Sequence, residues 1–309
     1  MATNTSTFVI SVTCFDKDDK FDVAAQRAHF RRLVAAGIGV YVGGGGSGEA
    51  YNLSTEEYRH LIQVAQEELK GKVPFRVMGV EPRSAKEMVA LYGLVKPFAP
   101  DALQIYSLDV GHSGKPMNQE LEIYFRDVLE QVPMPCVISS HQSVGYNVPV
   151  PTLKKLVADY PQVVGINATC SDVRYIAELA AEIKTVELHV GGPMQALQAF
   201  ALGGHGYLSS EGNLVPKLCM SVINDYKAGD MPRLFSDYAL LLQIFRHNSQ
   251  AASIAGVKAA MQVLGLPGGG YTRKPRMPVS EARLAEIKKW IRELRIVEVE
   301  GLHAPAMSA

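Results

Sequence analysis

A run of glycines is the segment of this sequence best suited to binding a ligand. Residues 43–46 are all glycine, and Ser47, Gly48 and Glu49 follow at the end of a short apolar stretch. Glycine lets backbone N–H groups come close to a carboxylate or a phosphate. The spacing matches neither a dinucleotide-binding GxGxxG motif nor a Gly-Lys-Ser phosphate loop. A flexible turn is the alternative, but we expect an anion site here, formed by Gly45, Gly46, Ser47 and Gly48.

Histidine and serine side chains follow other apolar stretches. His141 lies two residues after Ser139, so on an extended chain the two side chains point to the same face. An imidazole titrates near neutral pH and could act as a general acid or base. His112 follows a different apolar stretch, and His189 lies inside one. For each histidine the alternative is a hydrogen-bonded structural role.

Metal and thiol chemistry are less well supported by the sequence. The residue types of Asp109, His112, His141 and His189 would suit a metal, but no HxH or HExxH spacing joins them. We therefore expect no metal site and no cofactor. Cys170 could be a nucleophile if a histidine lowered its pKa, but a small buried residue is the interpretation we favour. The cysteines form no CxxC pair, which argues against a disulfide framework or a zinc ribbon.

Eight short apolar stretches alternate with amphipathic helical patterns and would position these groups. The predicted strands are residues 8–12, 40–43, 75–79, 102–107, 135–139, 163–167, 185–190 and 206–209. Strands alternating with helices predict a parallel sheet, and eight of them match an α/β fold of the (β/α)8 TIM-barrel type. Active sites of such barrels are built at the carboxyl ends of the strands, where the residues above fall.

The remaining chain reads as helices, at residues 217–227, 231–245, 249–264 and 280–294. A glycine- and proline-rich segment, residues 265–278, separates the last two. The barrel needs only two of these helices. We therefore predict a barrel over residues 1–225 and a C-terminal helical region over residues 226–309, packed on the barrel.

Several motifs together resemble the dihydrodipicolinate synthase / N-acetylneuraminate lyase family, over at least residues 8–295. They are Ser47-Gly48-Glu49 followed by Leu53-Ser54, Gly165-Ile166, Gly203-Gly204-His205-Gly206 before Ser209, and Gly256-Val257-Lys258-Ala259-Ala260. The resemblance implies a lyase whose glycine loop holds the carboxylate of a 2-keto acid. It also implies a homotetramer built as a dimer of dimers.

The departures from the family pattern concern its catalytic groups. Asn167 stands where the resemblance places the lysine that forms a Schiff base, and Ser139 stands at the position of a tyrosine. Gly46 replaces the first of two threonines in the loop. An amide nitrogen is not a nucleophile, so Asn167 cannot form an imine. Lys115 could conceivably replace the lysine, but an exposed loop lysine is normally only solvated.

We therefore expect a lyase-like enzyme that acts on a small 2-keto or 2-hydroxy carboxylate without a Schiff base. His141 would move a proton, while Ser139, Ser140 and Asn167 would orient the substrate or stabilise an enolate. The predicted substrate-binding residues also include His112, Gly191 and Ser209. The alternative from another class is a catalytically silent barrel that binds a metabolite or serves as a partner subunit.

Composition and charge restrict the other possible partners. The chain of 309 residues has 31 basic and 31 acidic side chains and no basic stripe, so we expect no nucleic-acid partner. No apolar stretch approaches the roughly 20 residues that span a bilayer, and the first residues lack a signal-peptide pattern. We expect a cytoplasmic protein that binds a small carboxylate and no membrane.

Overall fold

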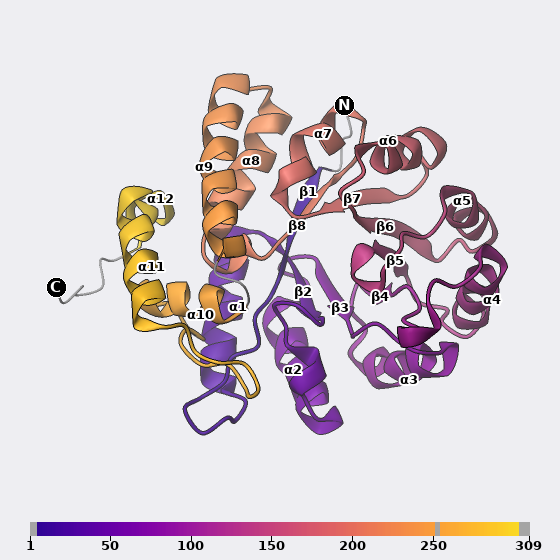
Figure 1. The fold of residues 1–309 in the computed structure, drawn as a ribbon, viewed down its shortest axis with the longest axis horizontal. Helices are drawn as coiled ribbons and strands as arrows, with labels where there is room; N and C mark the ends of the chain where they lie inside the picture. The colour runs from indigo at the N-terminus through magenta and orange to yellow at the C-terminus, as the bar shows by residue number, and fades with distance from the viewer. Residues whose placement is uncertain (1–4, 251–253, 303–309) are drawn as a thin grey trace. The chain divides into compact units, whose positions relative to one another are not determined.

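Eight parallel strands run in chain order around a closed barrel (Figure 1). The computed structural model describes residues 5–250 and 254–302. The strands are β1 (Ser6–Ile10), β2 (Gly39–Gly43), β3 (Phe75–Met78), β4 (Ala102–Ile105), β5 (Cys136–His141), β6 (Val163–Thr169), β7 (Glu187–Gly191) and β8 (Gly206–Ser209). The predicted (β/α)8 barrel and all eight predicted strands are confirmed.

The strands are short and largely buried because helices cover the outside of such a barrel while side chains fill its interior. Every residue of β2, Gly-Val-Tyr-Val-Gly, is buried, as expected for a parallel strand covered on both faces. Two strands extend two residues beyond their predicted carboxyl ends. β5 continues to His141 and β6 to Thr169. Ser140 and His141 therefore belong to a strand rather than to a loop.

Helices follow the strands in order. They are α1 (Val23–Ala36), α2 (Thr55–Leu69), α3 (Ala85–Val95), α4 (Asn118–Leu129), α5 (Val150–Asp159), α6 (Val173–Glu182) and α7 (Ala196–Ala201). A capping box defines the start of α2. The Ser54 side chain accepts a hydrogen bond from the Glu57 N–H, and the Glu57 carboxylate accepts one from the Ser54 N–H.

The described residues of the C-terminal part form five helices. They are α8 (Pro216–Ala228), α9 (Met231–Gln250), α10 (Ile254–Val263), α11 (Glu281–Glu293) and α12 (Ile296–Glu300). Four correspond to predicted helices, although the third was predicted to begin at residue 249, inside α9. Residues 251–253 lie outside the described residues. In the described part of the chain, no helix has both the length and the apolar character needed to cross a bilayer.

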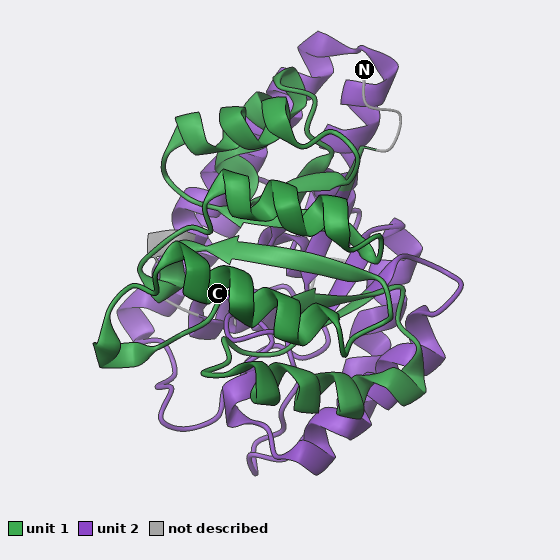
Figure 2. Ribbon diagram, turned by 90° about the vertical axis from the view of Figure 1, so that its right-hand side faces the viewer, with its two compact units in different colours: residues 1–6, 76–208 green, residues 7–75, 209–309 purple. Residues whose placement is uncertain are grey.

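The chain forms two compact units (Figure 2). Unit 1 comprises residues 1–6 and 76–208, and within it helices α3 to α7 pack in sequence, each on the next. Unit 2 comprises residues 7–75 and 209–309, and within it α1 packs on α2, α8 on α9 and α10 on α11. The predicted division of the chain at residue 225 stays a prediction.

Candidate active site

The glycine loop, residues 43–48, follows β2 in unit 2 and owes its shape to particular glycines. Gly43 and Gly44 have φ angles of 89° and 86°, in the region that side chains other than glycine rarely adopt. A Cβ atom on Gly48 would lie 1.8 Å from the Gly43 carbonyl oxygen, so no larger residue fits there. A Cβ atom on Gly46 would meet nothing within 4 Å. Gly48 is therefore required by packing, whereas Gly46 is not.

Hydrogen-bond donors of the loop remain available for a ligand. The N–H groups of Glu49 and Ala50 donate to Gly46 and Gly44. Within the described residues, the N–H groups of Gly45, Gly46 and Ser47 donate to no other group, and the nearly buried Ser47 hydroxyl has no hydrogen bond. The Thr13 hydroxyl fixes the loop by donating to the Gly48 carbonyl at 2.6 Å. Donors arranged in this way suit an anion, and the predicted binding of one by this loop stays a prediction.

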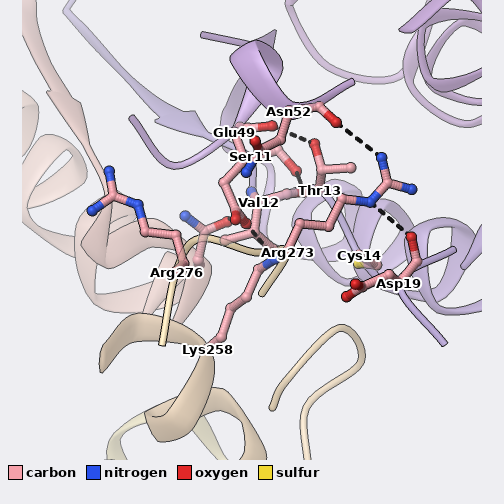
Figure 3. A network of polar contacts seen from close by, with 12 residues as sticks. Ser11, Val12, Thr13, Cys14, Asp19, Glu49, Asn52, Lys258, Arg273 and Arg276 are labelled. Atoms are coloured by element: carbon pink, nitrogen blue, oxygen red, sulfur yellow. Dashed lines mark hydrogen bonds and ion pairs between the residues drawn. The ribbon is translucent and has the colours of Figure 1, made fainter. Parts of the chain in front are cut away.

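A buried ion pair anchors the end of the glycine loop (Figure 3). Lys258 of α10 donates to Glu49 at 2.5 Å, and neither side chain has any exposed surface. The Lys258 ammonium also lies 4.4 Å from the centre of the Phe15 ring. Burial lowers the pKa of Lys258, and the Glu49 carboxylate opposes that shift. Lys258 is thus a positioning residue for the loop.

Arg273 fixes the glycine- and proline-rich segment beside the same loop (Figure 3). Its guanidinium lies 4.3 Å from the Phe15 ring centre and forms an ion pair with Glu57. It also donates to the backbone carbonyls of Asn52 and Asp19 at 3.0 and 2.8 Å. Two cations therefore contact Phe15, and residues 265–278 are held by specific bonds rather than acting as a free linker.

Ser209, a predicted substrate-binding residue at the end of β8, is engaged with a carboxylate. Its hydroxyl donates to Glu211 at 2.9 Å, and the Ser210 hydroxyl donates to the other oxygen of Glu211 at 2.9 Å. Asn248 donates to the same carboxylate at 3.4 Å, and Glu211 is only 1% exposed. Glu211 was not among the residues predicted from the sequence, although an acidic residue two positions after a predicted barrel strand was a usable signal.

In unit 1, the structure brings together two of the predicted catalytic residues. Ser139 of β5 and Asn167 of β6 are register partners, and Asn167 is the register partner of His189 on β7. The side-chain amide of Asn167 donates to Gln104 of β4 at 2.5 Å. All four residues are buried. Gln104 was missed, although a glutamine inside the apolar strand Ala-Leu-Gln-Ile was an available signal.

His141, the predicted proton-transfer residue, has a defined tautomer. Its Nδ1 accepts a hydrogen bond from the Ser143 N–H at 3.0 Å, so the neutral ring carries its proton on Nε2. Within the described residues, Nε2 has no hydrogen-bond partner. Burial lowers the pKa of His141, and the nearby Glu81 carboxylate opposes the shift. His141 is therefore suited to donate a hydrogen bond from Nε2.

Glu81, which lies three residues after β3, accompanies His141. Its carboxylate accepts a hydrogen bond from the Ser143 hydroxyl at 3.0 Å, so Ser143 contacts both groups. The side chain is only partly buried. A carboxylate beside a neutral imidazole can accept a proton while the imidazole stabilises negative charge. Glu81 was not among the residues predicted from the sequence, even though it follows a predicted strand end.

Two other predicted residues, Ser140 and Gly191, have structural roles at the ends of their strands. The Ser140 hydroxyl contacts the Tyr175 hydroxyl at 2.7 Å and accepts from Asn147 and the Val148 N–H. It thus fixes the chain after β5. A Cβ atom on Gly191 would lie 1.9 Å from the Thr169 hydroxyl, so only glycine fits at the end of β7. Whether Ser140 and Gly191 contact substrate stays a prediction.

The loop after β4 and the cysteines add little reactive chemistry. His112 and Lys115 are both exposed. All four cysteines are buried, and burial raises the pKa of Cys170, which disfavours the thiolate. Burial also lowers the pKa of His189 well below its usual value, with its Nε2 2.8 Å from the Ser6 hydroxyl. Across residues 5–250 and 254–302, no group of three potential side-chain ligands could hold a metal ion.

Comparison with known proteins identifies the family. The model of the dihydrodipicolinate synthetase family matches residues 3–294. The chain belongs to this family. The 4-hydroxy-tetrahydrodipicolinate synthase of Methanopyrus kandleri is 28% identical over 88% of this chain and 89% of its own length. A DapA-like lyase of Pyrococcus abyssi is 26% identical over 93% of this chain and 97% of its own.

Solved structures of dihydrodipicolinate synthetase relatives share the fold. YagE of E. coli K12, solved in complex with pyruvate, has a TM-score of 0.86 and 22% identity over 96% of this chain and all of its own. The N-acetylneuraminate lyase of Mycoplasma synoviae has a TM-score of 0.80 and 20% identity over 94% of this chain and 98% of its own. The family is one of lyases, and this chain has a lyase-family barrel.

Proposed function

We propose that the protein is a lyase that acts on a small 2-keto or 2-hydroxy carboxylate without a Schiff base. The observation that carries the proposal is the glycine loop, which offers the N–H groups of Gly45, Gly46 and Ser47 and the Ser47 hydroxyl. Such donors suit a carboxylate and need no particular side chain. The family resemblance implies a substrate of this class, and YagE was solved in complex with pyruvate.

The imine step of a Schiff-base lyase needs a substitute in this proposal, because Asn167 occupies the position that the resemblance assigns to the lysine. An iminium ion withdraws electrons from the neighbouring carbon. Here the carbonyl oxygen itself would take up the negative charge as an enolate. Nε2 of His141 would stabilise it by donating a hydrogen bond, and Asn167, the register partner of Ser139, would help to orient the substrate.

The proton would be taken by Glu81 in this mechanism. Its carboxylate is partly exposed and is linked to the His141 loop through Ser143. Since Nδ1 of His141 already accepts the Ser143 N–H, the ring would lose that bond if it became protonated. We therefore assign the role of general base to Glu81 and the role of electrophilic donor to His141. Ser139 would help to orient the substrate.

One experiment tests carboxylate binding by the glycine loop. Thermal shift with a panel of 2-keto and 2-hydroxy acids is measured for the wild-type protein, Gly48→Ala and Gly46→Ala. We expect binding to be lost in Gly48→Ala, whose new Cβ would lie 1.8 Å from a carbonyl oxygen, and retained in Gly46→Ala, whose Cβ meets nothing. Equal binding by both variants would remove the loop from the proposal.

A second experiment tests the chemistry assigned to unit 1. Turnover of any acid that binds is measured in Glu81→Gln, His141→Gln and the control His60→Gln, which changes an exposed helical histidine. Loss of one positioned general base or one oxyanion donor typically costs about a hundredfold or more in kcat. We expect such losses in the first two variants and none in the control. Full turnover in Glu81→Gln would refute its assigned role.

The alternative is a catalytically silent barrel that binds a metabolite or serves as a partner subunit. It is favoured by the internal bonds of Asn167 and Ser140, which satisfy groups that a substrate would otherwise contact. Binding without turnover across the panel would support it. By family resemblance we also propose a homotetramer, a dimer of dimers, which light scattering would test. A cytoplasmic location stays a prediction.

A further inference from the structure

Two cavities lie at the amino-terminal ends of β6, β7 and β8 in unit 1. One has a volume of about 370 Å³ and lies beside Val163, Thr185 and Glu187. The other has a volume of about 270 Å³ and lies beside the ends of α6 and α7. Both are lined by Lys184 and His205, so they adjoin each other. Their volumes are near the lower end of the range for small-ligand pockets, roughly 300–1,000 Å³.

The cavity of about 370 Å³ favours a negatively charged group. The one carboxylate in its lining, Glu187, already accepts a hydrogen bond from Arg76 at 2.6 Å. Lys184 forms no ion pair within 4.0 Å in the described part of the chain. Arg76 neutralises the Glu187 carboxylate, whereas no carboxylate of the described residues pairs with the Lys184 ammonium. The lining therefore has an excess of positive charge. An anion is therefore the complementary ligand.

His205, which lines both cavities, is a hydrogen-bond donor. Its Nδ1 accepts a hydrogen bond from the Leu188 N–H at 3.1 Å, so the neutral ring carries its proton on Nε2. Its backbone also bonds to both neighbouring strands: its N–H donates to Leu188 at 2.7 Å, and its carbonyl accepts from Ser6 at 2.8 Å. A ring fixed in this way is a preorganised donor.

The second cavity is mainly apolar. Beyond Lys184 and His205, its lining consists of aliphatic side chains and glycine, including Ala180, Ile183 and Leu202. A short hydrocarbon chain would be removed from water there, and each buried CH₂ group would increase the affinity about fourfold. The two cavities together thus suit a molecule with an anionic head and a small apolar tail.

We propose that these cavities form a second binding site, which takes a small aliphatic monocarboxylate. Lys184 and His205 would bind the carboxylate, and the tail would occupy the cavity between α6 and α7. This site lies at the opposite end of β6 from Asn167 and Thr169. The seven residues of β6 span roughly 20 Å, so the site is separate from the residues assigned to catalysis.

The test measures binding of 4-methylpentanoate to the full chain by isothermal titration calorimetry, with 4-methylpentanamide as the uncharged control ligand. Lys184→Met removes the cation, and Ala180→Phe fills the apolar cavity. Lys86→Met, which changes an exposed lysine of α3, is the matched control. We expect at least about a tenfold rise in Kd for Lys184→Met and Ala180→Phe, none for Lys86→Met, and weaker binding of the amide.

Three results would overturn the proposal: no binding to the wild-type protein, an unchanged Kd in Lys184→Met, or equal binding of acid and amide. Lys184 is exposed, so its variant is expected to remain folded, and circular dichroism checks the fold of Ala180→Phe. Because the measurement is of binding at this end of β6, its outcome does not depend on turnover by Glu81 or His141.

Discussion

Replacing Lys258 with methionine tests whether the buried ion pair holds the glycine loop. The variant keeps most of the apolar stem of the side chain but leaves the Glu49 carboxylate buried without its cation, since both side chains have no exposed surface. Removing one partner of such a pair typically costs about 3–5 kcal/mol. For a chain of 309 residues this corresponds to a decrease in Tm of roughly 5–8 °C.

In Lys258→Met the glycine loop itself should also change, in addition to the decrease in global stability. Glu49 has a φ angle of 49°, a left-handed conformation that costs a residue other than glycine about 1–2 kcal/mol. The ion pair with α10 offsets that cost. Without it, we expect the loop to become more dynamic and carboxylate binding to weaken in Lys258→Met, at temperatures well below Tm. Hydrogen exchange of the loop amides would measure this directly.

A double variant and a surface control complete the test, with unfolding followed by urea denaturation. In Lys258→Met/Glu49→Gln neither of these two positions carries a buried charge, so the double variant should regain at least about 1 kcal/mol over Lys258→Met. Lys289→Met breaks an exposed pair, 69% and 59% exposed, and should change stability by less than about 0.5 kcal/mol. If Lys258→Met behaves like Lys289→Met, the anchoring role is refuted.

Three further predictions concern titration and covalent chemistry. Burial raises the pKa of Cys14 and of Cys136 to about 12. Iodoacetamide near pH 8 should therefore leave both thiols of the folded protein unlabelled. Peptide mass spectrometry measures the labelling, and labelling of either thiol would contradict its burial. Pyruvate with borohydride should give no adduct by intact mass, because Lys115 is exposed and position 167 is an asparagine; a pyruvyl adduct would revive imine chemistry. Burial lowers the pKa of His29 from 6.5 to about 3, so between these pH values the unfolded chain binds a proton that the folded protein does not. The free energy of unfolding should therefore decrease as the pH is lowered from 6.5 to 3, by up to about 1.4 kcal/mol per pH unit. Urea denaturation should show a weaker pH dependence of stability in His29→Gln, and an identical dependence would refute the assignment.

The barrel was predictable because its signal is local. Each strand is a short apolar stretch, and each is followed by an amphipathic helix, so the alternation alone indicates the fold. The ends of β5 and β6 were less predictable. Ser140, His141 and Thr169 are polar residues that pair in register with the neighbouring strand, and this pairing, which the sequence does not display, extends both strands.

The candidate site was predictable only in part, because its contacts join distant residues. The side-chain period of a strand correctly placed Ser139 and His141 on one face. The bond between Gln104 and Asn167 joins residues 63 positions apart, and no sequence pattern indicates it. Likewise, four consecutive glycines look equivalent in the sequence. Only the folded backbone shows that the later Gly48 has no room for a Cβ atom while Gly46 has ample room.

The pairing of Glu49 with Lys258 has a consequence for synthesis. The two residues are 209 positions apart, so a nascent chain contains the glycine loop long before it contains the lysine that anchors it. The ion pair can therefore form only after α10 has left the ribosome and docked. A polypeptide that ended before that point would contain the loop with the Glu49 carboxylate unpaired.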